Sequence, residues 1–246
     1  MPIINKILLC KCTAAHILTE DNISQLTAYL NDNNITFDTA DDLCKLASEK
    51  SAILKDYADE GAIIIACQPR AIRWLFNAAG VALPDSTKLL NLRNDSIESI
   101  VEELKNITTS KESARHIELP PDSPLPWFPV IDYDRCINCK QCMNFCIFGV
   151  YSINDGNIEV TNPTKCKPNC PACSRVCPAQ AIIFAKYDKA PFDGSKVPES
   201  VKPKTMSAVD IFTQLKQRNS ANDLKAMQDE LDIPDAVIKD LDNKKL

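Results

Sequence analysis

The chain has 246 residues and a formal net charge of −5, with 28 Lys and Arg against 33 Asp and Glu. This length allows one or two domains plus extensions, and the hydrophobic content of 45% is ample for buried cores. There is no basic stripe of the kind that binds nucleic acid, and no run of about 20 apolar residues that could insert into a membrane. Because the N-terminus carries no credible export signal, we expect a cytoplasmic protein.

Residues 1–109 alternate between apolar runs and amphipathic segments. Short apolar runs, typical of strands, occur at 3–10, 35–39, 61–67 and 88–93. Apolar residues at helical spacing, typical of amphipathic helices, occur within 18–34, 41–58, 69–80 and 95–106. This alternation predicts a small α/β domain with a mostly parallel sheet over residues 1–109.

Two linkers and a tail are predicted in the rest of the chain. Residues 110–130 form a Pro-rich linker, in which a stiff, extended backbone is expected, with Trp127 and Phe128 packing as its last apolar residues. A domain at 131–187 follows, and then a second linker at 188–206. Residues 207–246 predict a tail of short helices, which are marginal alone, so we expect this helical tail to dock on the chain or on a partner.

Eight of the 12 cysteines form two runs within residues 131–187. The first run has the spacing C-x2-C-x2-C-x3-C and consists of Cys136, Cys139, Cys142 and Cys146. The second run has one more residue in its first gap, precedes Pro178, and consists of Cys166, Cys170, Cys173 and Cys177. Such a run supplies three thiolates to one 4Fe-4S cluster and the fourth to another. Zinc usually takes two pairs of ligands across a longer loop, and disulfides need an oxidising compartment.

Two such runs back to back resemble the bacterial two-cluster ferredoxin, over about residues 130–187. The resemblance implies an α+β ferredoxin-like domain in which each fourth cysteine ligates the other cluster. The first cluster would then be held by Cys136, Cys139, Cys142 and Cys177. The second would be held by Cys166, Cys170, Cys173 and Cys146. Ile147 replaces the usual proline after the first run, which predicts a changed potential rather than a lost site.

Strands are also expected around these cysteines. Residues 130–132 and 182–184 should pair as outer strands. Residues 151–160 should form a hairpin, because Asp155-Gly156 is a favoured two-residue turn between strands.

The four remaining cysteines are Cys10, Cys12, Cys44 and Cys67. Cys10 and Cys67 fall at the carboxyl ends of predicted strands, and Cys44 follows another, where open α/β sheets gather their ligands. Cys10 and Cys12 are two apart in a segment expected to be extended, so their side chains should point the same way. Four thiols could therefore converge.

The segments that carry these cysteines, ILLCKC and IIIACQPRAIRWLF, resemble the N-terminal cysteine-bearing part of a heterodisulfide reductase polypeptide and of related iron–sulfur proteins. That resemblance implies a third iron–sulfur cluster. Arg70 favours it, because a cation at a helix N-terminus opposes the helix dipole unless an anion such as a thiolate-ligated cluster is near. Buried free thiols, redox-active thiols and zinc are the other interpretations of these four residues.

Other cofactors and catalytic groups have no support in the sequence. The five glycines form neither a dinucleotide fingerprint nor a P-loop, so no flavin or nicotinamide is predicted, and no nucleophile–base pair can be named. We expect an electron carrier that passes single electrons between redox partner proteins. The alternatives are a redox-sensing or interaction module, and a subunit of a heterodisulfide-reductase-like enzyme.

Overall fold

The computed structural model describes residues 4–59, 61–105, 107–109, 114–119, 125–199 and 201. All of them belong to the first of two units, 1–203 and 204–246, into which the chain divides. The predicted tail at 207–246 lies outside the described residues. Within the described part, no helix combines the length and apolar character needed to cross a membrane.

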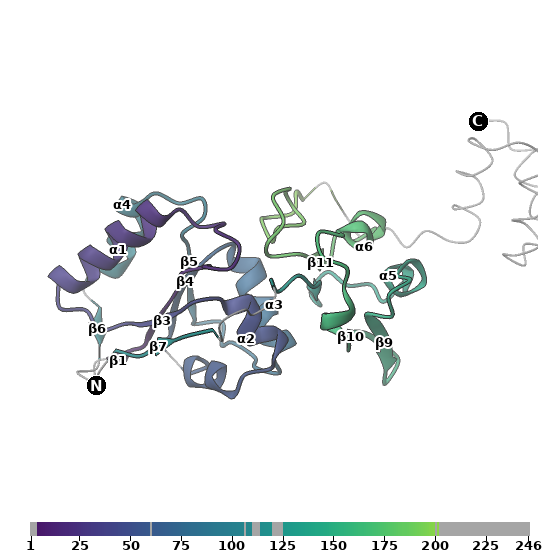
Figure 1. Ribbon diagram of the computed structural model, residues 1–246, viewed down its shortest axis with the longest axis horizontal. Helices are drawn as coiled ribbons and strands as arrows, with labels where there is room; N and C mark the ends of the chain where they lie inside the picture. Colours follow the sequence, from purple (N-terminus) through teal and green to yellow (C-terminus); the bar gives the residue numbers. More distant parts are fainter. Residues whose placement is uncertain are drawn as a thin grey trace, which may run out of the picture. The chain divides into compact units, whose positions relative to one another are not determined.

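The N-terminal part is built on a five-stranded sheet with the order β5-β4-β2-β3-β7 (Figure 1). Its strands are β2 (Ile7–Cys10), β3 (Asp38–Ala40), β4 (Ile63–Ala66), β5 (Lys88–Asn91) and β7 (His116–Ile117). Every pairing in this sheet is parallel, which confirms the predicted α/β fold. β2 and β4 are buried along their whole length, as expected for strands covered on both faces.

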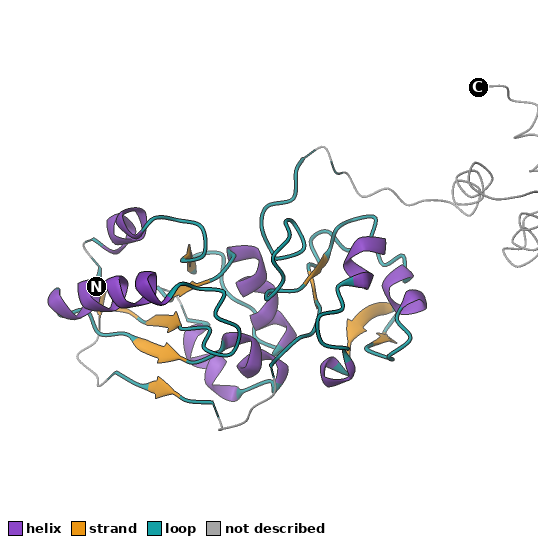
Figure 2. Ribbon diagram, turned by 45° about the horizontal axis from the view of Figure 1, so that its top comes forward, coloured by secondary structure: helices purple, strands orange, loops and turns teal. Residues whose placement is uncertain are grey.

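Helices flank the strands of this sheet (Figure 2). They are α1 (Glu20–Asp32), α2 (Leu43–Ser48), α3 (Pro69–Ala78) and α4 (Ile97–Leu104). α1 packs on α4, and α2 packs on α3. The helical segment predicted at 41–58 is divided into α2 and a 3-10 helix, η1 (Ala52–Tyr57). The break follows from Lys50, whose φ of 52° is left-handed and cannot continue a right-handed helix.

Local sequence explains where these helices begin and end. The Thr19 side chain accepts a hydrogen bond from the Asn22 amide and caps α1. Pro69 is the first residue of α3, where its missing N–H is no loss. Gly80, with a φ of 80°, follows the end of α3, because glycine adopts this conformation without strain.

Two short strand pairings were not predicted. β1 (Ile4–Asn5) pairs with β6 (Thr108–Thr109) in a separate two-stranded sheet. β7 comes from the segment predicted as a Pro-rich linker. Its position is stabilised by Arg115, which donates to Asp38 from its backbone at 2.7 Å and forms ion pairs with Asp38 and Asp56. A strand of two residues is too short to show a periodic pattern, so only these long-range contacts reveal it.

The cysteine-rich part contains short helices and two antiparallel pairings. Its elements are β8 (Val130–Ile131), α5 (Gln141–Phe145), β9 (Tyr151–Asn154), β10 (Asn157–Val160), η2 (Pro163–Lys165), α6 (Ala172–Val176) and β11 (Ile182–Ile183). β8 pairs with β11, and β9 pairs with β10, as predicted. The hairpin turns at Asp155 and Gly156, whose φ values of 48° and 80° suit a type I′ turn. The α+β character of this region is thereby confirmed.

The β8–β11 ribbon lies between two hydrophobic cores. Ile183 and Val130 belong to the core of the α/β sheet, whereas Ile182 and Ile131 belong to the core of the cysteine-rich part. This division follows from the strand geometry, because successive side chains point to opposite faces. Trp127 and Phe128 are both buried, as predicted, and are likewise divided between the two cores.

Gly194 brings the segment after β11 against α3, and this contact is testable. A Cβ on Gly194 would lie 2.5 Å from the Cβ of Ala71, and the φ of 94° is unfavourable for any other residue. Gly194→Ala should lower the free energy of unfolding by about 2 kcal/mol or more. Gly156→Ala is the matched control, since Gly156 has a similar φ but open space around it, and should cost only about 1 kcal/mol.

Denaturant unfolding of the two variants, followed by circular dichroism, measures this difference. Equal losses would mean that the contact with Ala71 relaxes at no cost.

Candidate metal centres

The eight cysteines of the cysteine-rich part lie in tight loops and at two short helices. Cys142 lies in α5 and Cys173 lies in α6, and both are buried, while Cys139 is exposed. Left-handed residues recur between the cysteines, with φ values of 54° at Asn138 and 60° at Asn169. Asparagine tolerates this conformation better than most residues, which lets each loop curl around a common centre.

The cysteines of the first predicted set act on one another electrostatically. Burial raises the pKa of Cys142 to about 12, and the charges of Cys177, Cys173 and Cys136 contribute to the rise. The pKa of Cys136 is raised by burial and by Cys177 and Cys139. Cys177 therefore lies beside thiols of the first run, from which it is separated by more than thirty residues of chain.

The second predicted set shows the same pattern. Burial raises the pKa of Cys166 to about 12, and the charges of Cys173, Cys170 and Cys146 contribute to this. The pKa of Cys173 is raised to about 11 by burial, with Cys146 and Cys170 contributing to the rise. Cys146, the last cysteine of the first run, is thus a neighbour of the second run.

Hydrogen bonds reach two of these sulfurs. The Tyr151 hydroxyl donates to Cys173 Sγ at 3.1 Å, and the Ala181 amide donates to Cys177 Sγ at 3.3 Å. Both stabilise a thiolate more than a neutral thiol, and the Tyr151 bond lowers the pKa of Cys173 against the effect of burial. Tyr151 was not predicted as a site residue, because nothing in its local sequence distinguishes it from a core tyrosine.

The four N-terminal cysteines meet at the carboxyl edge of the sheet. The chain passes from β2 to β3 on one side and returns to β4 on the other, so a topological switch point lies between β2 and β4. Cys10 ends β2, and Cys67 directly follows β4. Cys44 lies in α2, and Cys12 has a left-handed φ of 51°, so the extended segment expected through Cys12 ends before it.

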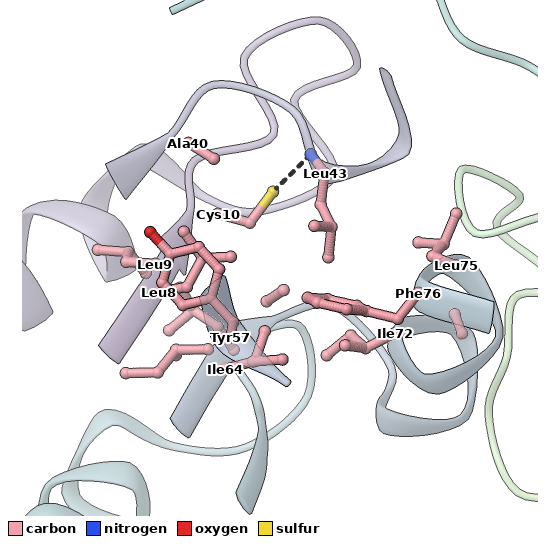
Figure 3. Close-up of a cluster of buried hydrophobic side chains, with 14 of the residues drawn as sticks. Leu8, Leu9, Cys10, Ala40, Leu43, Tyr57, Ile64, Ile72, Leu75 and Phe76 are labelled. Carbon is pink, nitrogen blue, oxygen red and sulfur yellow. Dashed lines mark hydrogen bonds between the residues drawn. The ribbon is translucent and has the colours of Figure 1, made fainter. Parts of the chain in front are cut away.

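Burial dominates the chemistry of these four thiols. It raises the pKa of Cys10 and Cys44 far above the usual value, with the charge of Asp42 adding to both. The pKa of Cys67 is raised to about 11 by burial and by Cys12, while Arg93 lowers it. Cys10 also accepts a hydrogen bond from the Leu43 amide at 3.4 Å, beside the apolar core of the sheet (Figure 3).

A buried lysine lies against this group of thiols. Lys186 Nζ is 3.7 Å from Cys12 Sγ and forms an ion pair with Asp42, and the side chains of Lys186 and Asp42 are 4% and 1% exposed. Burial alone lowers the pKa of Lys186, but the charges of Cys44, Asp42 and Cys12 raise it by more, so the ammonium stays protonated. Sequence reasoning missed Lys186, because a lysine after an apolar strand normally faces water.

The role expected for Arg70 is wrong. Its anion is not a cluster but the Asp132 carboxylate, with Nε and Oδ2 2.5 Å apart. Arg70 also donates to the backbone carbonyls of Gln180 and Pro191. The cations that act on the N-terminal thiols are instead Lys186 and Arg93.

The donor chemistry of both regions suits iron–sulfur clusters. Thiolates crowded in a dry site repel one another, and a bound metal offsets this by favouring their deprotonated form. Among the described residues, no three His, Cys, Asp or Glu side chains are close enough to hold a single metal ion. A four-iron cluster binds its thiolates at separate corners and accepts a wider spacing than one zinc ion does.

Comparisons with known proteins bear on the cysteine-rich part. A family model described as a 4Fe-4S binding domain matches residues 128–151. A curated relative, an uncharacterized ferredoxin from Methanocaldococcus jannaschii, is 42% identical over 67 residues, which are 27% of this chain and 46% of the relative. The match thus spans less than half of that relative. No solved structure matches this chain. The chain is an iron–sulfur binding, ferredoxin-like protein.

The new partner of Arg70 leads to a prediction about stability. Arg70→Met should lower the free energy of unfolding by about 3–5 kcal/mol, because it leaves the buried Asp132 carboxylate without its charge partner. The double variant Arg70→Met/Asp132→Asn removes both charges and should recover much of this loss. Denaturant unfolding of wild type and the two variants provides the measurement. A single variant as stable as wild type would show that the pair is dispensable.

Proposed function

We propose that this protein is an electron carrier with two 4Fe-4S clusters in its cysteine-rich part. One cluster is held by Cys136, Cys139, Cys142 and Cys177. The other is held by Cys166, Cys170, Cys173 and Cys146. The observation that carries this proposal is the grouping of the eight thiols, in which Cys177 lies among the first run and Cys146 among the second.

The clusters supply the one-electron chemistry, and the chain's own residues set its energy. Burial of Cys142 and Cys173 removes water, which disfavours the more negative, reduced state. The hydrogen bonds from Tyr151 and the Ala181 amide oppose this, since a donor aimed at sulfur stabilises added negative charge. Each cluster therefore has its own donor, and the two potentials can be tuned separately.

A third cluster at the N-terminal thiols is part of the proposal. Four cysteines from β2, β4 and their following segments act on one another at the switch point of the sheet, and within the described residues Asp42 is the carboxylate that acts on them. A site made mainly of sulfur donors favours iron–sulfur clusters over hard cations. The buried ammonium of Lys186 supports an anionic occupant, which thiolate-ligated iron would be.

Exposed apolar side chains near Cys146 support exchange of electrons with partner proteins. Phe145, Ile147 and Phe148 flank this cysteine, and Ile147 is 87% exposed. Apolar contact next to a cluster ligand would bring a partner's redox centre close to it while excluding water. We therefore propose redox partner proteins, rather than a small substrate, as donor and acceptor.

Metal content is the direct test of these assignments. Anaerobically reconstituted full-length protein should contain about twelve iron and twelve sulfide per chain if all three sites are filled. Cys10→Ser/Cys67→Ser should reduce this to about eight, because only the N-terminal site loses ligands. Iron and acid-labile sulfide assays measure both numbers.

Each outcome separates the parts of the proposal. Wild-type protein with about eight iron, unchanged in the double variant, would rule out the third cluster. Four iron or fewer would rule out the two-cluster arrangement as well.

A second test uses the hydrogen bond to Cys173. Tyr151→Phe removes the donor to this sulfur and should shift the midpoint potential of one cluster negative, leaving the other unchanged. Tyr133→Phe is the control, because the Tyr133 hydroxyl donates to the Ile158 carbonyl and not to a sulfur. A redox titration followed by electron paramagnetic resonance distinguishes them. Equal shifts in both variants would contradict the assignment.

A further inference from the structure

Lys186 joins the two metal-binding regions at a single buried point. It lies three residues beyond β11, in the cysteine-rich part of the chain, yet its ammonium contacts Cys12 of the α/β part. The contact spans 174 positions of sequence, and the Lys186 side chain is 4% exposed there. A lysine in such a place loses its hydration, so a compensating set of negative charges is required.

The charges around the four thiols come from several elements. Asp42, at the N-cap of α2, forms the ion pair with Lys186 and raises the pKa of Cys10 and Cys44. Arg93, just after β5, acts on Cys67, and its guanidinium lies 3.6 Å from Asp193. Each cation is therefore matched by one carboxylate, and the thiols sit beside two balanced pairs. Any charge on a metal–thiolate occupant adds to this balance.

The segment that carries Lys186 is packed firmly against the cysteine-rich core. Phe184, two residues earlier, stacks on Trp127 with ring centroids 5.2 Å apart. The Trp127 indole in turn donates to the carbonyl of Cys170 at 3.2 Å. Cys166 contacts both hydrophobic cores. The position of the ammonium at the N-terminal thiols is thus linked by direct contacts to the second run of cysteines.

We propose that the buried Lys186–Asp42 pair sets the redox potential of the N-terminal four-cysteine site, and that the cysteine-rich part supplies its positive half. This inference rests on the proposed third cluster. A cluster bound by four thiolates becomes more negative by one charge when it accepts one electron. The nearby ammonium stabilises that reduced state, whereas the carboxylate of Asp42 destabilises it.

The two halves of the pair should act with opposite sign, which a merely structural pair would not do. Lys186→Met should shift the midpoint potential of the N-terminal cluster negative. Asp42→Asn should shift it positive, and asparagine keeps the helix cap that Asp42 provides. Lys186→Arg should stay near wild type, because it retains the charge. The control is Lys189→Met, which removes an exposed lysine from the same segment.

The experiment is a redox titration of the full chain, followed by electron paramagnetic resonance at about pH 8, where an unpaired carboxylate remains ionised. Iron content is measured in parallel. Opposite shifts of the N-terminal signal, with the other two clusters unchanged, are the expected result. A third signal whose potential is the same in all variants, or shifts the same way in both, would overturn this inference and leave the third cluster standing. The absence of a third signal in wild type would instead overturn the third cluster itself.

Should Lys186→Met fail to retain its clusters, Asp42→Asn and Lys186→Arg still decide the question. A positive shift in the first with none in the second supports the inference, and the absence of a shift in both contradicts it.

Discussion

The two-stranded ribbon of β8 and β11 is the element on which the arrangement of both metal-binding regions depends. Its side chains alternate between two hydrophobic cores, so neither core can be complete without it. The ion pair of Arg70 with Asp132, which directly follows β8, holds the same ribbon to α3. Through these contacts the ribbon places Trp127 and Phe184 on the cysteine-rich side and Lys186 on the side of the sheet.

Burial gives the cysteines their chemistry in both regions. Dry surroundings raise the pKa of the thiols of Cys10, Cys44, Cys142 and Cys166. Such thiols are poor nucleophiles by themselves, but they become good ligands once a metal favours their deprotonation. This distinction favours metal binding over thiol chemistry at both groups. The protein then controls the bound clusters through hydrogen bonds and nearby charges, and these differ from one site to the next.

The two regions differ in how they gather their ligands. In the cysteine-rich part, most ligands of a cluster are neighbours in sequence, and tight loops with left-handed asparagines bring them together. In the α/β part, the thiols come from separate strands and meet because parallel strands end at one edge of the sheet. The second arrangement requires the whole sheet to fold first, which explains why it also receives a side chain from a distant segment.

The sequence alone was sufficient for features that depend on short-range patterns. Alternating apolar runs and amphipathic segments predicted the α/β sheet, the Asp155-Gly156 pair predicted the hairpin, and cysteine spacing predicted iron–sulfur binding. Only the tertiary structure revealed the pairing of Arg70 with Asp132, the strand β7 and the contact of Lys186 with Cys12. These contacts join residues far apart in the chain, and they are decided by which surfaces pack together and which buried charges must be paired. Local patterns carry no record of either, so a lysine that is buried beside a thiol looks the same in the sequence as one that faces water.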